Sequence, residues 1–334
     1  MFTISASTGI LRGYLDTKTP IVILVLANII NLLLDIVLIA FLKMGPLGAA
    51  IATTSAEWLS ALMFLGVLGG KLPSADGQLG SQSERKLGNG PVSVTPAAQI
   101  PPIEEIKPLI TASSSLFFRS LSLQLSISAA AAFAARGGED FPGGAASSIA
   151  AHQIAIQLWI LCSFTADALA AASQGLVADS LGRKDSDDVR SITNTVFLYS
   201  GGLGLILAGI LQLGYSTEFL LGIFTSDPGT QVALSSILSL IVIAQPVNSL
   251  VFAADGILQG ASEFTYQAKS MLVSVATAGI VFFALQETSS SDTLVHVWLG
   301  LITLQLMRGI TSLLKIIDKE GPIQLLGGSE ASSL

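Results

Sequence analysis

The stretch Pro20–Leu42, PIVILVLANIINLLLDIVLIAFL, decides the fold class of this chain. Apart from Asn28, Asn31 and Asp35, every residue after the proline is apolar. A membrane's hydrocarbon core is about 30 Å thick, and roughly 20 helical residues cross it. No water satisfies the backbone there, so a spanning segment must be helical or part of a closed barrel. The run is continuous rather than alternating, which predicts a membrane-spanning α-helix.

Further apolar blocks repeat this pattern along the 334 residues, of which 51% are hydrophobic and 12% charged. The mean hydropathy is +0.70. Soluble domains carry about a quarter charged residues, because their surface faces water. We therefore predict an all-α integral membrane protein with eight spans. We place these spans at about 20–42, 47–68, 108–135, 149–178, 192–214, 231–255, 266–286 and 293–316.

The positions of the 16 Lys and Arg residues support this count. Twelve of them fall on one predicted side of the membrane, whereas the other side holds only Lys43 and Arg136. Basic loops stay on the cytoplasmic side, so this asymmetry favours an even number of spans. It also places the C-terminus on the side equivalent to cytoplasm. Arg119 and Arg308 fall inside spans, and for Arg119 we favour a structural role.

Composition also limits the function. The net charge of −7 argues against a nucleic-acid partner, which needs a basic surface. A single cysteine, Cys162, permits no intramolecular disulfide. The sequence contains no HExxH, phosphate-loop or nucleophile-elbow motif. We therefore expect neither an enzyme nor a metal site, and no cofactor.

An internal repeat predicts two related halves. GILRG at Gly9–Gly13 recurs as GILQG at Gly256–Gly260, and an acid follows each copy at the same distance. Four predicted spans precede the second copy, but only eight residues precede the first. If the halves are equivalent, the whole protein has twelve helices in two lobes with parallel pseudo-symmetry. We therefore expect that the chain is truncated at its N-terminus. The alternative is an eight-helix protein in which the five-residue motif recurs by chance.

We assign four segments on this basis. Residues 1–68 form the C-terminal part of the N-lobe, and residues 69–107, rich in Pro, Gly, Ser and Gln, form a linker. Residues 108–318 form the C-lobe, and residues 319–334 form a C-terminal tail.

Several motifs resemble the MATE (multidrug and toxic compound extrusion) family. They are LRGYLDTKTP from Leu11, the spacing of Asn28, Asn31 and Asp35, GPLGAAIAT from Gly45, AAHQIAIQLW from Ala150, DALAAASQG from Asp167, QPVN from Gln245 and DGILQG from Asp255. The last motif is similar to the DinF-type branch, and the segment from Ala150 is similar to its plant and algal plastid members. The resemblance implies a twelve-helix, two-lobe transporter that exports organic solutes in exchange for H⁺ or Na⁺.

The first candidate site lies on the opening span. Asn28, Asn31 and Asp35 are spaced three and four residues apart, so they share one helix face. Carboxylates in hydrocarbon are costly and usually face an internal cavity. The resemblance implies that Asn31, Asp35 and Thr53 form the cation-coupling site. Asn28 and Glu57 are candidates for a substrate cavity, and hydrogen-bonded packing of helices is the alternative role.

The second group of candidates lies in the C-lobe. Asn248, Asp255 and Gln259 share a face at spacings of seven and four, beside Pro246, which can kink the helix. Asp255 is also close enough to the span's end to be merely interfacial. Gln153 and Asp167 fall on nearly one face of the 149–178 span. We predict that these residues line a substrate cavity, with helix packing as the alternative.

The sequence thus predicts a cation-coupled antiporter of small organic solutes that works as a monomer in a lipid bilayer. Its location is the plastid envelope by resemblance, or another cellular membrane. Two alternatives remain: a lipid or polysaccharide flippase of the same superfamily, and a truncated membrane protein that transports nothing.

Overall fold

The computed structural model describes residues 2–13, 16–70, 102–137, 141–217, 219–288 and 292–325. Within these ranges the chain forms helices joined by turns, with no strand. Eight of the helices are long and apolar enough to cross a membrane. They confirm the eight predicted spans and the all-α membrane class. Residues 71–101 of the predicted linker and residues 326–334 of the predicted tail lie outside the described part of the chain.

The helices run past the apolar blocks at several ends. The helix predicted to begin at residue 108 begins at Ile103 instead, so Pro108 lies inside it. Pro102 precedes its first residue, and Glu104 and Glu105 occupy the first turn, where carboxylates favour a helix N-terminus. Hydropathy detects only the part of a helix that lies in the hydrocarbon core of the membrane, so it does not detect such polar turns.

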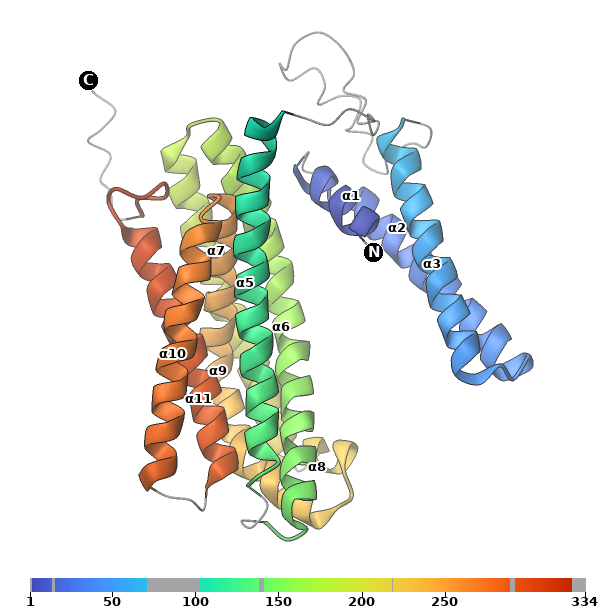
Figure 1. Ribbon diagram of the computed structural model, residues 1–334, viewed down its shortest axis with the longest axis vertical. Coiled ribbons are helices and arrows are strands. Elements are labelled where there is room, and N and C mark those ends of the chain that lie inside the picture. The colour runs from blue at the N-terminus through green and yellow to red at the C-terminus, as the bar shows by residue number, and fades with distance from the viewer. Residues whose placement is uncertain are drawn as a thin grey trace. The chain divides into compact units, whose positions relative to one another are not determined.

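The chain divides into two compact units, residues 1–100 and 101–334. The first contains α1 (Phe2–Gly13), α2 (Lys18–Asp35), the π-helix η1 (Ile36–Phe41) and α3 (Gly45–Leu68) (Figure 1). Its core is an apolar cluster contributed by all three α-helices: Leu11, Ile23, Phe64, Val67 and Leu68.

The π-helix continues α2 directly after Asp35. The backbone N–H of Leu42 donates to the carbonyl of Val37, five residues earlier, at 2.9 Å. In an α-helix this hydrogen bond would reach the residue four positions earlier. Each π-helical turn therefore contains one more residue than an α-helical turn. π-Helical turns inside α-helices are rare and frequently mark functional sites.

The second unit is a helical bundle that contains α5 to α11 (Figure 1). Its helices are α5 (Ile103–Ala134), α6 (Gly144–Gly182), α7 (Ser186–Ser216), the short α8 (Phe219–Phe224), α9 (Pro228–Gly260), α10 (Phe264–Thr288) and α11 (Thr293–Ile317). Of the spanning helices, α9 is the most buried and packs against α6, α7 and α11. Its apolar residues Leu234, Ile237, Leu238 and Ile241 are fully buried around Trp298. This central position places the polar residues of α9 inside the bundle.

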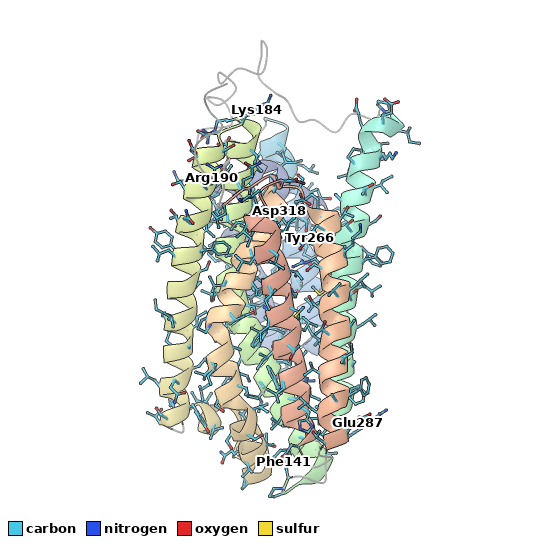
Figure 2. All side chains as sticks on the ribbon, turned by 90° about the vertical axis from the view of Figure 1, so that its left-hand side faces the viewer. Phe141, Lys184, Arg190, Tyr266, Glu287 and Asp318 are labelled. Atoms are coloured by element: carbon cyan, nitrogen blue, oxygen red, sulfur yellow. The ribbon has the colours of Figure 1, made fainter. Side chains whose placement is uncertain are left out.

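The outer surface of this unit suits lipid. Large apolar side chains such as Leu198, Leu205 and Leu213 on α7 are 73%, 65% and 68% exposed. Lys184, Arg190 and Asp318 lie at one end of the bundle, and Glu287 and Phe141 lie at the opposite end (Figure 2). Charged ends that flank an apolar belt are what a membrane-spanning bundle requires.

The two copies of the repeat adopt the same local structure. In the first, the backbone N–H of Asp16 donates to the carbonyl of Leu11 at 3.0 Å. In the second, the N–H of Glu263 donates to the carbonyl of Leu258 at 2.9 Å. Both leucines are fully buried, and a new spanning helix follows each copy. The sequence similarity of the two motifs therefore extends to their backbone geometry.

Candidate functional site

The polar residues of α2 contain two buried acceptor atoms with no donor. The side-chain Oδ1 atoms of Asn31 and Asp35 are both buried, and neither accepts a hydrogen bond from any residue that the structure describes. The two residues are one helical turn apart on the same face. Asn28 behaves differently, because its amide donates to the Leu24 carbonyl at 2.8 Å and its side chain is exposed. Asn31 and Asp35 therefore stand out as an unsatisfied pair.

The other candidates in this unit lie on α3. Thr53 is exposed, and no hydrogen bond joins it to Asn31 or Asp35. Glu57 is half-buried, one turn beyond Thr53. The structure therefore brings Asn31 and Asp35 onto one face without closing Thr53 onto them.

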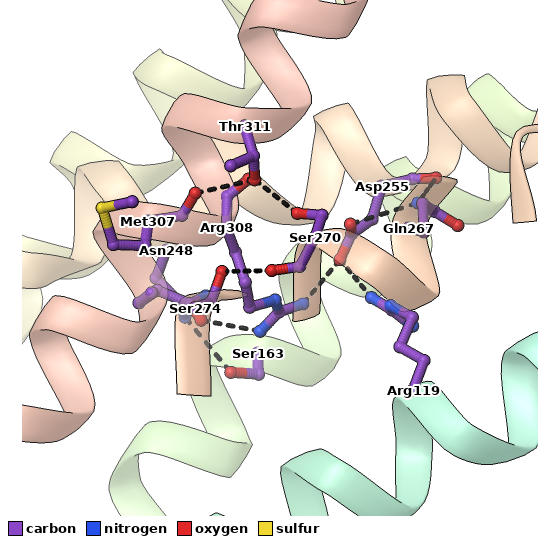
Figure 3. Close-up of polar contacts among 11 residues, drawn as sticks. Arg119, Ser163, Asn248, Asp255, Gln267, Ser270, Ser274, Met307, Arg308 and Thr311 are labelled. Carbon is purple, nitrogen blue, oxygen red and sulfur yellow. Dashed lines mark hydrogen bonds and ion pairs between the residues drawn. The ribbon is translucent and has the colours of Figure 1, made fainter. Parts of the chain in front are cut away.

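In the second unit, Asp255 of α9 binds side chains from three other helices (Figure 3). Its Oδ2 accepts from Arg119 of α5 and from Arg308 of α11, the latter at 2.5 Å. Its Oδ1 accepts from the amide of Gln267 on α10 at 3.2 Å, and that amide also binds the Asp255 carbonyl at 3.0 Å. Asp255 is 6% exposed and α9 continues to Gly260, so this carboxylate is buried inside the bundle.

A chain of hydrogen bonds continues from this carboxylate across the bundle. Arg308 donates to Gln305 at 2.7 Å, and Gln305 donates to Asn248 at 2.7 Å. Asn248 donates in turn to the hydroxyl of Ser163 on α6 at 3.1 Å. We call this set, from Asp255 to Ser163, the polar network. Asn248 and Asp255 both belong to it, whereas Gln259 is half-buried and makes no hydrogen bond to it.

A cavity of about 340 Å³ borders the polar network. Ser163, Asp167, Gln305 and Arg308 form its polar lining. The remainder is apolar and includes four aromatic residues, Trp159, Phe164, Phe252 and Trp298. Asp167 therefore lines this cavity, whereas Gln153 is exposed on α6 and does not.

A second cavity, of about 390 Å³, lies between α5, α10 and α11 and has a different chemistry. Its lining is apolar apart from Ser122 and Ser126, whose hydroxyls donate to carbonyls of their own helix. It offers a ligand no charge. Of these two cavities, the one bordering the polar network has the chemistry of a specific binding site.

Asn248 and Asp255 are predicted from the sequence, whereas their partners Gln267, Gln305 and Arg308 are not. The sequence did contain evidence for these contacts, because charged groups within a membrane almost always pair with one another or with backbone carbonyls. Arg119, Arg308 and Asp255 all fall within predicted spans, which favours such a pairing. Which charges meet depends on which helices are neighbours, and helical spacing within one span does not contain that information.

The comparisons with known proteins agree on one family. The family model MatE matches residues 144–285. Protein DETOXIFICATION 43 of Arabidopsis thaliana is 31% identical over 331 residues, which cover 98% of this chain and 56% of that protein. Protein DETOXIFICATION 45, chloroplastic, from the same plant is 28% identical over 317 residues, which cover 95% of this chain and 50% of that protein.

More distant relatives extend the similarity. DNA damage-inducible protein F of Escherichia coli is 25% identical over 307 residues, which cover 91% of this chain and 60% of the relative. The crystal structure of the eukaryotic MATE transporter AtDTX14 shares the fold with a TM-score of 0.67 at 17% identity, over 90% of this chain and 62% of that one. The chain thus spans about half to three fifths of the length of these proteins. The family model, the relatives and the common fold show that this multi-pass membrane protein is similar to the MATE family.

Proposed function

We propose that this chain is part of a secondary transporter that exports small organic solutes in exchange for H⁺ or Na⁺. The observation that carries the proposal is the pair of buried, unpartnered oxygens on Asn31 and Asp35. The family and its relatives support the substrate class. One of them, from Bacillus cereus, is named "Probable multidrug resistance protein NorM" and is 25% identical over 305 residues.

An unpartnered buried acceptor is costly, by about 1–3 kcal/mol for each atom. At Asp35 a proton would remove the charge and supply a donor. At Asn31 and Asp35 together, a small cation would instead be bound by carboxylate and amide oxygens, the ligands that hard cations prefer. Either ion relieves the same cost, so both remain candidates for the counter-ion.

Loading and release of this ion would drive export. In the proposed cycle, the cation binds Asp35 from the outward side, with Thr53 as a further oxygen ligand, and leaves inward as two lobes open alternately. A membrane potential of 100 mV contributes about 2.3 kcal/mol per charge moved. Linkage requires that cation and substrate favour different states, because each changes the affinity of the other by the same factor.

We also propose that the protein acts as a monomer in the plastid envelope. Two relatives whose names include "chloroplastic" support this location, at 28% and 27% identity. A fluorescent fusion of the full-length protein, imaged beside chlorophyll, tests it. Fluorescence on another membrane would contradict it.

The coupling is tested with the full-length protein in liposomes that contain pyranine, a pH indicator. We expect ethidium export to be stimulated by an imposed proton or sodium gradient, and to lose that stimulation in the variant Asp35→Asn. The matched control is Asp187→Asn, whose carboxylate is 83% exposed at the bundle's end and pairs with Arg190. If Asp35→Asn keeps its gradient dependence, the assignment is wrong. Movement of labelled lipid without ethidium export would favour the flippase, and movement of neither would favour a non-transporting protein.

A further inference from the structure

One residue that lines the cavity beside the polar network has a buried donor with no acceptor among the described residues. Arg308 is 5% exposed and lines this cavity. Its two terminal nitrogens are engaged, one by Gln305 and one by Asp255. Its Nε–H is buried and has no partner within the described part of the chain. A guanidinium edge with a spare N–H is a ready donor to a carboxylate.

The charge around Arg308 points the same way. Arg119 and Arg308 share the single carboxylate of Asp255, so one positive charge is left unbalanced at this end of the cavity. A buried excess charge is unfavourable until a counter-charge approaches it. A ligand carboxylate at the Nε–H of Arg308 would supply both the missing acceptor and the missing charge.

The cavity also contains an unpaired acid. Asp167 on α6 makes no hydrogen bond or ion pair with any described residue, and it is exposed at the cavity rim. It lies one helical turn beyond Ser163, or about 6 Å along the axis, and Ser163 ends the polar network. An ammonium group fits beside this carboxylate. The region contains two arginines and two aspartates, so its formal charges sum to zero. A ligand with one positive and one negative charge keeps that sum at zero.

The remaining walls define the body of the ligand. Trp159, Phe164, Phe252 and Trp298 give the cavity an aromatic lining suited to a flat apolar group. Its volume of about 340 Å³ lies within the range of small-molecule sites. We propose that this cavity binds a zwitterionic small molecule with an aromatic body, its carboxylate on Arg308 and its ammonium on Asp167. This inference rests on the proposed transport function, for which it names a substrate class.

Three indole compounds with different charges test the proposal. L-tryptophan carries both charges, tryptamine only the ammonium and 3-indolepropionate only the carboxylate. Radiolabelled tryptophan is bound to the purified full-length protein in detergent, and the other two compete with it. We expect tryptophan to bind at least tenfold more tightly than either competitor. Equal or tighter binding of a competitor would overturn the proposal, as would no binding of any of the three.

Two variants test which side chain binds which charged group of the ligand. Asp167→Asn should weaken tryptophan and tryptamine about tenfold and leave 3-indolepropionate unchanged. Arg308→Lys keeps a cation for Asp255 but removes Nε, so it should weaken tryptophan and 3-indolepropionate and leave tryptamine unchanged. The control Asp179→Asn alters an acid on the same helix that pairs with Arg183 outside the cavity. It should change nothing. If Arg308→Lys does not fold, Asp167→Asn still decides, because Asp167 has no partner to lose.

This binding assay is independent of coupling. It uses no imposed gradient and no variant of Asp35, so its outcome does not depend on ion-driven export. If Asp35→Asn loses gradient dependence while no indole compound binds, the zwitterion site is wrong and the antiport proposal stands. If tryptophan binds as expected while Asp35→Asn keeps its gradient dependence, the zwitterion site stands and the antiport proposal is wrong.

Discussion

Asp35 and Asp255 are both acids inside membrane-spanning helices, yet their surroundings are opposite. Asp255 accepts hydrogen bonds from two arginines and a glutamine amide contributed by three other helices. Asp35 has a buried oxygen that accepts from none of the described residues. A fully satisfied buried carboxylate stabilises the arrangement of its helices, whereas an unsatisfied one has capacity to bind something else. The comparison therefore separates a structural acid from a candidate for coupling.

The glycines of the two repeat copies differ in the same way. A Cβ on Gly256 would overlap the Ala170 carbonyl and the Ser173 hydroxyl, because α9 packs against the backbone of α6 there. A Cβ on Gly9 or Gly13 would meet no atom within 4 Å in the described structure. One motif thus has the same backbone geometry in both units but a close helix contact in only one.

The largest effect is expected from Asp255→Asn. It leaves the buried guanidinium of Arg308 and the half-buried one of Arg119 without a carboxylate. Breaking a buried ion pair costs about 3–5 kcal/mol. The free energy of unfolding, measured by denaturant titration in detergent micelles, should fall by that amount. Arg119→Gln is the control, because it leaves Arg308 and Asp255 as a balanced pair and should cost less. Equal losses in both variants would contradict the structural role of Asp255.

Gly256→Ala should have the next largest effect. The added methyl group forces α6 and α9 apart, and overpacking of this kind costs about 1–3 kcal/mol. Gly9→Ala, the equivalent change in the first unit, should be neutral or stabilising by about 0.5–1 kcal/mol, because alanine favours a helix. Denaturant titrations that measure the free energy of unfolding of both variants test this difference. A similar loss at both sites would mean that the two copies are packed alike.

Asp35→Asn should not destabilise the protein, in contrast to Asp255→Asn. The introduced amide can donate to the unpartnered Oδ1 of Asn31 four residues earlier, which would add about 0.5–1.5 kcal/mol. The same titration measures this gain. A loss above about 2 kcal/mol would show that Asp35 has a stabilising role like that of Asp255.

The smallest effect concerns Asp227, a third well-satisfied acid, which lies in water before α9. The Thr230 hydroxyl and backbone N–H donate to it at 2.7 and 2.8 Å, and these bonds lower its pKa. Because the folded state prefers the ionised form, this stabilisation is present above about pH 4. It is lost as the pH falls through the lowered pKa. Asp227→Asn keeps the helix cap but should lack this pH dependence, so unfolding midpoints of the two proteins should converge in acid.

The fold was predictable because bilayer thickness and backbone hydrogen bonding act on each span separately. Pro20–Leu42 alone was enough to predict a helix, and all eight spans are confirmed. The ends were less predictable. Ile103 precedes the expected start because charged residues such as Glu104 continue a helix into water, where hydropathy has no signal.

The candidate sites were predictable only in part. Helical spacing placed Asn31 with Asp35 and Asn248 with Asp255, because residues on one helix have fixed relative positions. The link from Asp255 to Arg308 joins residues 53 positions apart on different helices. Such contacts follow from tertiary packing, which composition and period do not reveal. The lack of a donor for Asp35 is equally a property of the assembled helices.

The π-helix after Asp35 also predicts which changes of length the chain can accept. Elsewhere in a membrane-spanning helix, deleting one residue turns everything beyond it by about 100° and exchanges lipid-facing for inward-facing side chains. Between Ile36 and Phe41 one residue is already surplus to α-helical winding. Shortening this segment by one position converts it to an ordinary α-helical end, and α2 before it keeps its phase. Natural length variation within this span should therefore be confined to these six positions.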